Sequence, residues 1–241
     1  TDYLEKLKSI ERVTFIGCGS SFNAGLLGNY MFEEITGLPC EYEFADEFVD
    51  RNPVIEFGTT FIALSQSGRT GDTIDAVKHA RESGAFVISI TNTPDSELSK
   101  LSHLHLYTEA GEEKGIEATK SYTATVILEL ILALVIAQEQ NVAGQTAVEI
   151  IKKLKSLPDK MRKTIELEQT ISKYAIKIHG QEHLVVLGRK FNYPTALEAS
   201  QKIKETSYLD SEAYASEEFL HGPNAILEPG FPVLLMLPDD S

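Results

Sequence analysis

The sequence predicts an α/β protein made of two tandem domains, each a parallel β-sheet flanked by helices, with the second domain incomplete. Two observations predict this fold class. Short β-rich apolar segments alternate with helical segments, which is typical of βαβ units and parallel sheets. The chain also aligns with itself, without gaps, when it is shifted by 171 residues.

The strands are expected where short apolar runs lie between Gly, Ser or Asn residues. They are Val13–Ile16, Thr60–Leu64, Phe86–Ile90, His103–Tyr107 and Leu184–Leu187. Helical patterns fill the spaces at Ser21–Thr36, Thr73–Ser83 and Ala118–Gln138. The segment 145–178 is also helical, and we expect Pro158 to break it into two helices because proline removes a helix hydrogen bond.

The internal repeat sets the expected domain boundaries. The aligned pairs are Ile16-Gly17 with Leu187-Gly188, Glu34 with Glu205, Phe44–Phe48 with Ala215–Phe219, and Phe61–Leu64 with Pro232–Leu235. We therefore expect a first domain at 1–140, a helical linker at 141–180 and a second domain at 181–241. The same shift carries the end of the first copy beyond Ser241, so we expect the second copy to be truncated.

The composition of the chain argues against nucleic acid and membrane as binding partners. The 241 residues are enough for a substantial core, but a net charge of -14 argues against nucleic-acid binding, which needs a basic face. The two cysteines, Cys18 and Cys40, form no CxxC motif or Cys/His cluster, so a reducing, cytoplasmic setting is expected. The longest apolar stretch, 125–137, is short for a membrane span and contains Glu129, so we expect a buried helix and no membrane partner.

The loop after the second predicted strand has the composition of a phosphate site. Gly68 and Gly71 allow a tight turn that points amide N–H groups at one spot, and the following helix N-terminus attracts anions. Hydroxyl and amide groups come from Ser65, Gln66, Ser67 and Thr70. The alternative is an ordinary capped helix start, in which Ser and Thr serve only as N-cap residues.

A second glycine-rich turn, Gly17-Cys18-Gly19-Ser20-Ser21, follows the first predicted strand. It lacks the third glycine of a dinucleotide fingerprint and the Gly-Lys-Ser/Thr of a P-loop. Because parallel strands end at the same edge of a sheet, we expect it to lie beside the Ser65–Thr70 loop and complete a sugar-phosphate site.

Candidate catalytic residues lie in the second half of the chain. Lys202 and Glu205 fall late in a predicted helix, and His221 stands in a His-Gly-Pro loop. A carboxylate can move a proton between adjacent carbons, and a histidine can open a sugar ring. The alternatives are a solvated helix charge for Glu205 and a loop histidine satisfied by backbone for His221.

Two further groups are expected to be structural. His103 and His105 share one strand face, but no Asp, Glu or Cys stands at ligand spacing, so we expect a strand edge and no metal. Glu112-Glu113-Lys114 is expected to be a solvated turn, and the flanking Gly111 and Gly115 make it a candidate mobile loop.

Taken in order, these motifs resemble the sugar isomerase (SIS) domain family, and within it the double-domain, flavodoxin-like members. Those members include the isomerase half of glucosamine-6-phosphate synthase and the related deaminases. The resemblance covers nearly the whole chain. Its motifs are Gly-Cys-Gly-Ser-Ser at 17–21, Ser-Gln-Ser-Gly-Arg-Thr at 65–70, Ala-Thr-Lys-Ser-Tyr-Thr at 118–123, Ala-Leu-Glu-Ala-Ser-Gln-Lys-Ile-Lys-Glu-Thr-Ser-Tyr at 196–208, Glu-Ala-Tyr at 212–214 and His-Gly-Pro at 221–223.

The resemblance implies a role for each matched residue. Phosphate would be held by Ser65, Gln66, Ser67 and Thr70, and the sugar site would be lined by Ser20, Ser21 and Ala118. Glu205 would move the proton between C1 and C2, with Lys202 in support. His221 would open the ring from the partner subunit of a homodimer. No metal or redox cofactor is implied.

The sequence differs from the synthase pattern at several positions, and these differences affect the function we expect. The synthase usually has Glu at the position of Arg69 and a different segment at 116–120, and it uses a C-terminal lysine beyond Ser241. No glutaminase segment precedes Thr1 in this sequence, which favours a deaminase converting glucosamine 6-phosphate to fructose 6-phosphate and ammonia. The alternatives are the isomerase domain of the glutamine-dependent aminotransferase and a non-catalytic sugar-phosphate sensor.

Overall fold

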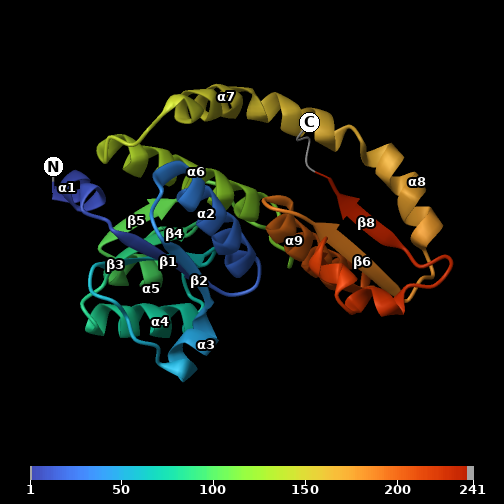
Figure 1. The fold of residues 1–241 in the computed structure, drawn as a ribbon, viewed down its shortest axis with the longest axis horizontal. Coiled ribbons are helices and arrows are strands. Elements are labelled where there is room, and N and C mark those ends of the chain that lie inside the picture. The colour runs from blue at the N-terminus through green and yellow to red at the C-terminus, as the bar shows by residue number, and fades with distance from the viewer. Residues whose placement is uncertain (1, 238–241) are drawn as a thin grey trace.

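The computed structural model describes residues 2–237 and contains two parallel β-sheets with helices packed around them (Figure 1). Thr1 and residues 238–241, the last of the predicted second domain, lie outside the described part. The prediction of an α/β fold with parallel sheets flanked by helices is confirmed.

The first sheet has five parallel strands in the order β2-β1-β3-β4-β5. Their bounds are Arg12–Gly17 for β1, Cys40–Phe44 for β2, Thr59–Ser65 for β3, Phe86–Thr91 for β4 and Leu104–Tyr107 for β5. Four of them match predicted segments within two residues at each end. The exception is β2, an edge strand in which glutamates alternate with apolar residues, so it carries no continuous apolar signal.

Helices cover both faces of this sheet, which is why its central strands are buried along almost their whole length. One face packs against α1 (Asp2–Lys8), α2 (Ser20–Thr36) and α6 (Lys120–Glu139). The other packs against α3 (Ala45–Arg51), α4 (Gly71–Glu82) and α5 (Glu97–Leu101).

The predicted apolar helix is α6, and the expectation that it is buried in part is confirmed by Leu132, Ala133 and Ile136 in the core. The apolar stretch 125–137 lies inside this longer helix. With 20 residues, α6 is long and apolar enough to cross a bilayer by length and composition alone. In this fold it packs lengthwise against α2 instead (Figure 1).

The linker helices differ from the prediction. Pro158 does not break the segment: α7 runs from Gln145 to Ile165 with Pro158 inside it, and α8 begins only at Glu168 and ends at Ile178. An internal proline removes one backbone hydrogen bond, but this part of α7 is exposed, so water can solvate the freed carbonyl. The break falls instead at residues 166–167, where the chain makes a turn.

The second sheet has three described strands in the order β7-β6-β8, again all parallel. They are β6 (His183–Gly188), β7 (Asp210–Ala215) and β8 (Val233–Met236). One face packs against α9 (Asn192–Ser207), and Phe219 packs on the other. Two short 3-10 turns, η1 (Glu218–Leu220) and η2 (Pro223–Ile226), connect β7 to β8.

The two sheets meet through the pair of helices that follow the first strand of each sheet along the chain. α2 follows β1, α9 follows β6, and the two helices are in direct contact (Figure 1). Tyr30 of α2 lies edge-on to Phe191 at the start of α9, with ring centroids 6.4 Å apart. This contact brings the C-terminal half of α9 to the glycine-rich turn before α2.

Candidate functional site

The Ser65–Thr70 loop leaves the carboxyl end of β3 and leads directly into α4. The buried Ser65 hydroxyl lies 2.9 Å from Thr70 Oγ1 and accepts the Gly68 N–H at 3.1 Å. Ser67 Oγ accepts the N–H of Arg69 at 3.2 Å. Thr70 occupies the N-cap position of α4, yet its side chain makes no capping hydrogen bond. The hydroxyls therefore organise the loop rather than cap the helix.

Gly68 fixes the path of this loop. Its φ of +60° lies in the left-handed region, and a Cβ atom at this position would fall 2.1 Å from Ser96 Oγ. Its carbonyl accepts the N–H of Leu98 at 3.0 Å, and the carbonyl of Gln66 accepts the N–H of Asn92 at 2.9 Å. The predicted role of Gly71 differs: it has no such φ, and a Cβ atom there would meet nothing within 4 Å.

The second glycine-rich turn lies on the neighbouring strand. β1 pairs in parallel with β3, so their carboxyl ends, at Gly17 and Ser65, reach the same edge of the sheet. Ser20 and Ser21 form the first turn of α2 and are half-buried. The structure thus places both predicted turns at one sheet edge, which is where open parallel sheets bind ligands.

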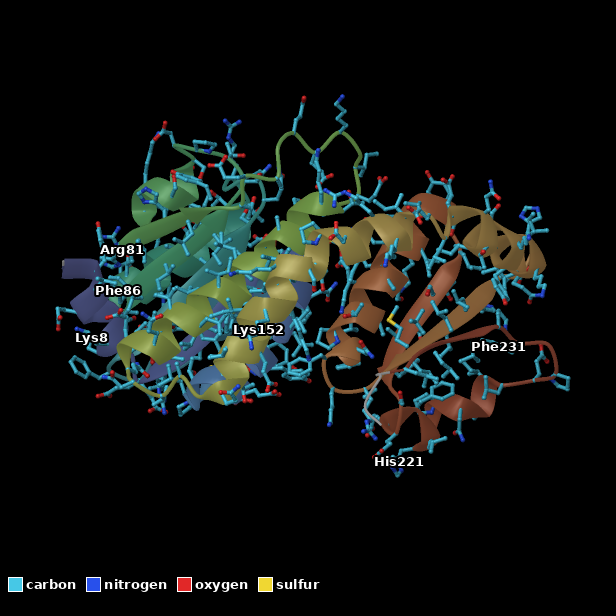
Figure 2. The ribbon with its side chains drawn as sticks, turned by 90° about the horizontal axis from the view of Figure 1, so that it is seen from above. Lys8, Arg81, Phe86, Lys152, His221 and Phe231 are labelled. Carbon is cyan, nitrogen blue, oxygen red and sulfur yellow. The ribbon has the colours of Figure 1, made fainter. Side chains whose placement is uncertain are left out.

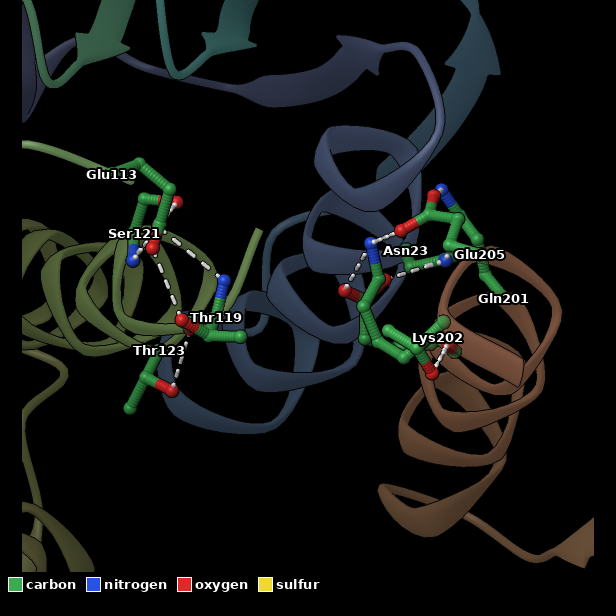
Figure 3. A network of polar contacts seen from close by, with 10 residues as sticks. Asn23, Glu113, Thr119, Ser121, Thr123, Gln201, Lys202 and Glu205 are labelled. Atoms are coloured by element: carbon green, nitrogen blue, oxygen red, sulfur yellow. Dashed lines mark hydrogen bonds and ion pairs between the residues drawn. The ribbon is translucent and has the colours of Figure 1, made fainter. Parts of the chain in front are cut away.

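Glu205 lies on α9, whose neighbouring Gln201 reaches the glycine-rich turn at Gly19 (Figure 3). One carboxylate oxygen accepts a hydrogen bond from Gln201 Nε2 at 2.8 Å, and the other contacts Lys202 Nζ at 2.5 Å. Partial burial raises the pKa of Glu205, but the bonds from Lys202 and Gln201 outweigh it and hold the pKa below its ordinary value. Glu205 is therefore an ionised carboxylate near neutral pH, the form that a general base requires.

Asn23 links this carboxylate to α2. It is buried, with 6% exposure, and its Nδ2 donates to Gln201 Oε1 at 3.0 Å and to Glu198 Oε2 at 2.9 Å. Beside it, the space above Gly19 is closed by Gln201, whose Nε2 would lie 3.2 Å from a Cβ atom there. Sequence reasoning missed Asn23, Glu198 and Gln201. The available signal was the i, i+4 spacing of Gln201 and Glu205 on one helix face.

His221 lies apart from this cluster. It sits between η1 and η2, is exposed, and points away from the second sheet at the edge of the molecule (Figure 2). Among the described residues its imidazole makes no hydrogen bond or ion pair, so Glu205 and Lys202 are not its partners within the chain. The prediction that His221 acts from a partner subunit stays a prediction.

Ala118 is half-buried and stands two residues before α6. Near it, the Glu113 carboxylate accepts four hydrogen bonds from Thr119 and Ser121, through both backbone and side-chain donors, at 2.5 to 3.3 Å (Figure 3). Partial burial raises the pKa of Glu113, but these bonds lower it to about 2. The expectation of a purely solvated turn at 112–114 is wrong, because Glu113 caps the N-terminus of α6.

This chain is similar to one known protein family and to named proteins within it. The model of the SIS domain family matches residues 6–137. Two curated relatives named glutamine–fructose-6-phosphate aminotransferase [isomerizing] align over nearly the whole chain. The one from Chlorobaculum tepidum is 36% identical over 240 residues, 100% of this chain and 39% of its own length. The one from Clostridium tetani is 39% identical over 233 residues, which are 96% of this chain and 38% of that relative. The chain thus spans about two fifths of these relatives.

Two solved structures are similar. The C-terminal domain of glucosamine-fructose-6-phosphate aminotransferase from Francisella tularensis aligns with a TM-score of 0.96 and 32% identity, covering 99% of this chain and 68% of that one. Glucosamine-6-phosphate deaminase from Thermotoga maritima aligns with a TM-score of 0.79 and 26% identity, covering 99% and 72%. The family resemblance expected from the motifs is confirmed, and the chain belongs to the SIS domain family.

Proposed function

We propose that this chain is the sugar-phosphate isomerase part of a glutamine-dependent fructose-6-phosphate aminotransferase. The observation that carries the proposal is that elements of both halves of the chain meet at one sheet edge. The hydroxyl-rich Ser65–Thr70 loop and the Gly17–Ser21 turn come from the first sheet, and the ionised Glu205 comes from α9 of the second. Together they offer an anion site and a general base.

Phosphate binds at the loop in this scheme. Ser65, Gln66, Ser67 and Thr70 supply hydroxyl, amide and backbone donors, and the α4 N-terminus adds partial positive charge. The overall charge of -14 does not oppose this, because local donors decide anion binding. Ser20, Ser21 and Ala118 line the sugar.

Proton transfer then falls to Glu205. Ammonia from glutamine first condenses with the C2 carbonyl of the ketose and releases water, leaving an imine at C2. The Glu205 carboxylate then takes a proton from C1, giving a C1–C2 enolamine, and returns it to C2, while the proton of the O1 hydroxyl ends on the nitrogen. The ketose thus becomes a 2-amino aldose with no net redox change. Lys202, which contacts the same carboxylate, stabilises negative charge on the sugar oxygens. His221 opens the ring, supplied by the second subunit of a homodimer.

This proposal replaces the deaminase as the preferred activity. The curated relatives described above carry the aminotransferase name, and the solved aminotransferase domain matches with higher identity and TM-score than the deaminase does. The preference for the deaminase rested on the segment before Thr1, and where a sequence begins carries no information about activity.

We also propose that the two sheets are two copies of one domain, at 1–140 and 181–241, joined by the 141–180 linker. A shift of 171 residues carries the bounds of β1 onto those of β6. It also carries α2 onto α9 within one residue, and β2 onto β7 within one residue. The strand order β2-β1-β3 corresponds to β7-β6-β8.

The test is turnover by the full-length protein. We expect formation of glucosamine 6-phosphate from fructose 6-phosphate with glutamine, and a loss of at least a hundredfold in kcat for Glu205→Gln with sugar-phosphate binding retained. The exposed Glu149→Gln on α7 is the matched control. If the protein releases ammonia from glucosamine 6-phosphate but does not form that sugar from fructose 6-phosphate and glutamine, the deaminase activity is favoured instead. Tight binding without any turnover would support a sensor.

A further inference from the structure

The Glu205 carboxylate is anchored on α2 as well as on its own helix. Glu205 accepts from Gln201, Gln201 accepts from Asn23, and Asn23 lies one turn into α2, just after the Gly17–Ser21 turn. We propose that Asn23 and Gln201 are positioning residues that hold Glu205 against this turn for proton transfer. The proposal rests on the isomerase function proposed above.

The direction of each hydrogen bond in this chain is fixed by chemistry. The ionised Glu205 carboxylate can only accept, so Gln201 must present its NH₂ group to it, at 2.8 Å. The Gln201 carbonyl oxygen then faces Asn23. Asn23 must therefore present its own NH₂ group, which reaches Gln201 Oε1 at 3.0 Å and Glu198 Oε2 at 2.9 Å. Each amide thus has one orientation.

Burial makes the chain rigid at its α2 end. Asn23 and Glu198 are each 6% exposed, so breaking their bond would leave two polar groups without water. Gln201 also closes the space above Gly19, because its Nε2 lies 3.2 Å from where a Cβ atom would stand. Glu205 is therefore linked through Gln201 and Asn23 to the first turn of α2, directly after the turn that we assign to the sugar site.

Asn23 has a second effect through Lys202. The Lys202 ammonium lies between two carboxylates, 2.5 Å from Glu205 Oε2 and 3.6 Å from Glu198 Oε1. Asn23 satisfies the other oxygen of Glu198. Without that bond the buried Glu198 would compete with Glu205 for the lysine. Asn23 thus keeps Lys202 at the catalytic carboxylate.

The electrostatic consequence is measurable. Among the described residues, the charged group that acts on the pKa of Glu205 is Lys202, while Gln201 acts through its hydrogen bond. α2 contributes the neutral Asn23 to this contact. Loss of the Gln201 donor should raise the pKa of Glu205, because a hydrogen bond to the charged form favours that form.

The experiment compares Gln201→Met with wild type in the full-length protein, with exposed Gln138→Met on α6 as the matched control. For Gln201→Met we expect kcat to fall about ten- to a hundredfold, since small misplacement of a reacting group is costly. KM for fructose 6-phosphate should change less than about threefold, and the acid limb of the pH profile should move up by about half a unit to one unit. Thermal unfolding confirms that each variant is folded.

Two additional measurements separate the outcomes. Asn23→Leu should also lower kcat, and the double variant should lose less than the product of the two single losses, because both act through one chain of bonds. Carbon-13 NMR titration of the Glu205 carboxyl reports its pKa without turnover. If the wild-type protein has no isomerase activity but Gln201→Met still raises the pKa of Glu205, the isomerase function is overturned and the positioning role is kept. If Gln201→Met keeps the kcat of wild type and the acid limb of its pH profile does not move, the positioning role is overturned.

Discussion

Glu129 of α6 packs so closely against Gly28 of α2 that a Cβ atom on Gly28 would lie 2.9 Å from the glutamate Cδ. The Glu129 side chain is fully buried, and neither of its carboxyl oxygens has a hydrogen-bond partner among the described residues. Burial raises the pKa of Glu129 well above its ordinary value of 4.5. A polar acid therefore occupies the apolar seam between two helices that support the site.

Replacing Glu129 by Leu should stabilise the protein at neutral pH by about 1 to 3 kcal/mol, the cost of an unsatisfied buried polar group. The folded state holds the Glu129 proton above pH 4.5, where the unfolded state releases it, so wild-type stability falls as pH rises from about 4.5. Glu129→Leu should lack that fall. Urea unfolding at pH 5 and pH 7.5 measures both effects, with Glu149→Leu as the exposed control. Equal pH dependence in the variant and wild type would show that Glu129 is not the group involved.

Gly28→Ala should destabilise the fold. The added methyl group would also lie 2.8 Å from Phe15 Cε1, so α2 would have to move away from β1 and α6. Such overpacking costs about 1 to 3 kcal/mol, which exceeds the roughly 1 kcal/mol that alanine gains over glycine in a helix. Denaturant unfolding measures the net change. A net gain in stability would mean that the α2–α6 seam is looser than the structure shows.

Glu113→Gln should weaken the start of α6. The variant loses the charge that Thr119 and Ser121 stabilise, and a lost cap costs about 1 kcal/mol. Because the folded-state pKa of Glu113 is lowered to about 2, this stabilisation is present above pH 4.5 and is lost as pH falls toward 2. Unfolding at pH 6 should therefore separate the variant clearly from wild type, and the difference should be much smaller at pH 2.5. The neighbouring Glu112→Gln, which changes an exposed glutamate, should match wild type at both values.

Local patterns in the sequence predicted the first sheet and the loops at its carboxyl edge, because a strand such as β3 and the turn after it lie within one short window. What they could not predict were contacts between distant side chains. Asn23 and Gln201 are 178 residues apart, and no periodicity records that one amide faces the other. β2 was missed for a different reason: it lies at a sheet edge, and Glu41 and Glu43 alternate with its apolar residues, so it has no continuous apolar run. The charge state of Glu129 depends on what surrounds it, which only the packed structure supplies.

Gly68→Ala tests the phosphate loop itself. A Cβ atom at Gly68 would lie 2.1 Å from Ser96 Oγ and 2.5 Å from Ser96 Cβ, and φ is +60°, so the loop cannot keep its path. Because Ser65 Oγ accepts the Gly68 N–H, moving Gly68 also disturbs the hydroxyl pair of Ser65 and Thr70.

We expect this variant to bind fructose 6-phosphate at least tenfold more weakly by titration calorimetry, while the sheets stay folded. Gly71→Ala is the structural control, since a methyl group there meets no protein atom within 4 Å and should leave the loop intact. Changing Ser96 to Gly in the Gly68→Ala background would remove the clash but not the strain of a left-handed alanine. It should therefore recover only part of the affinity. Undiminished binding by Gly68→Ala would place the phosphate away from this loop.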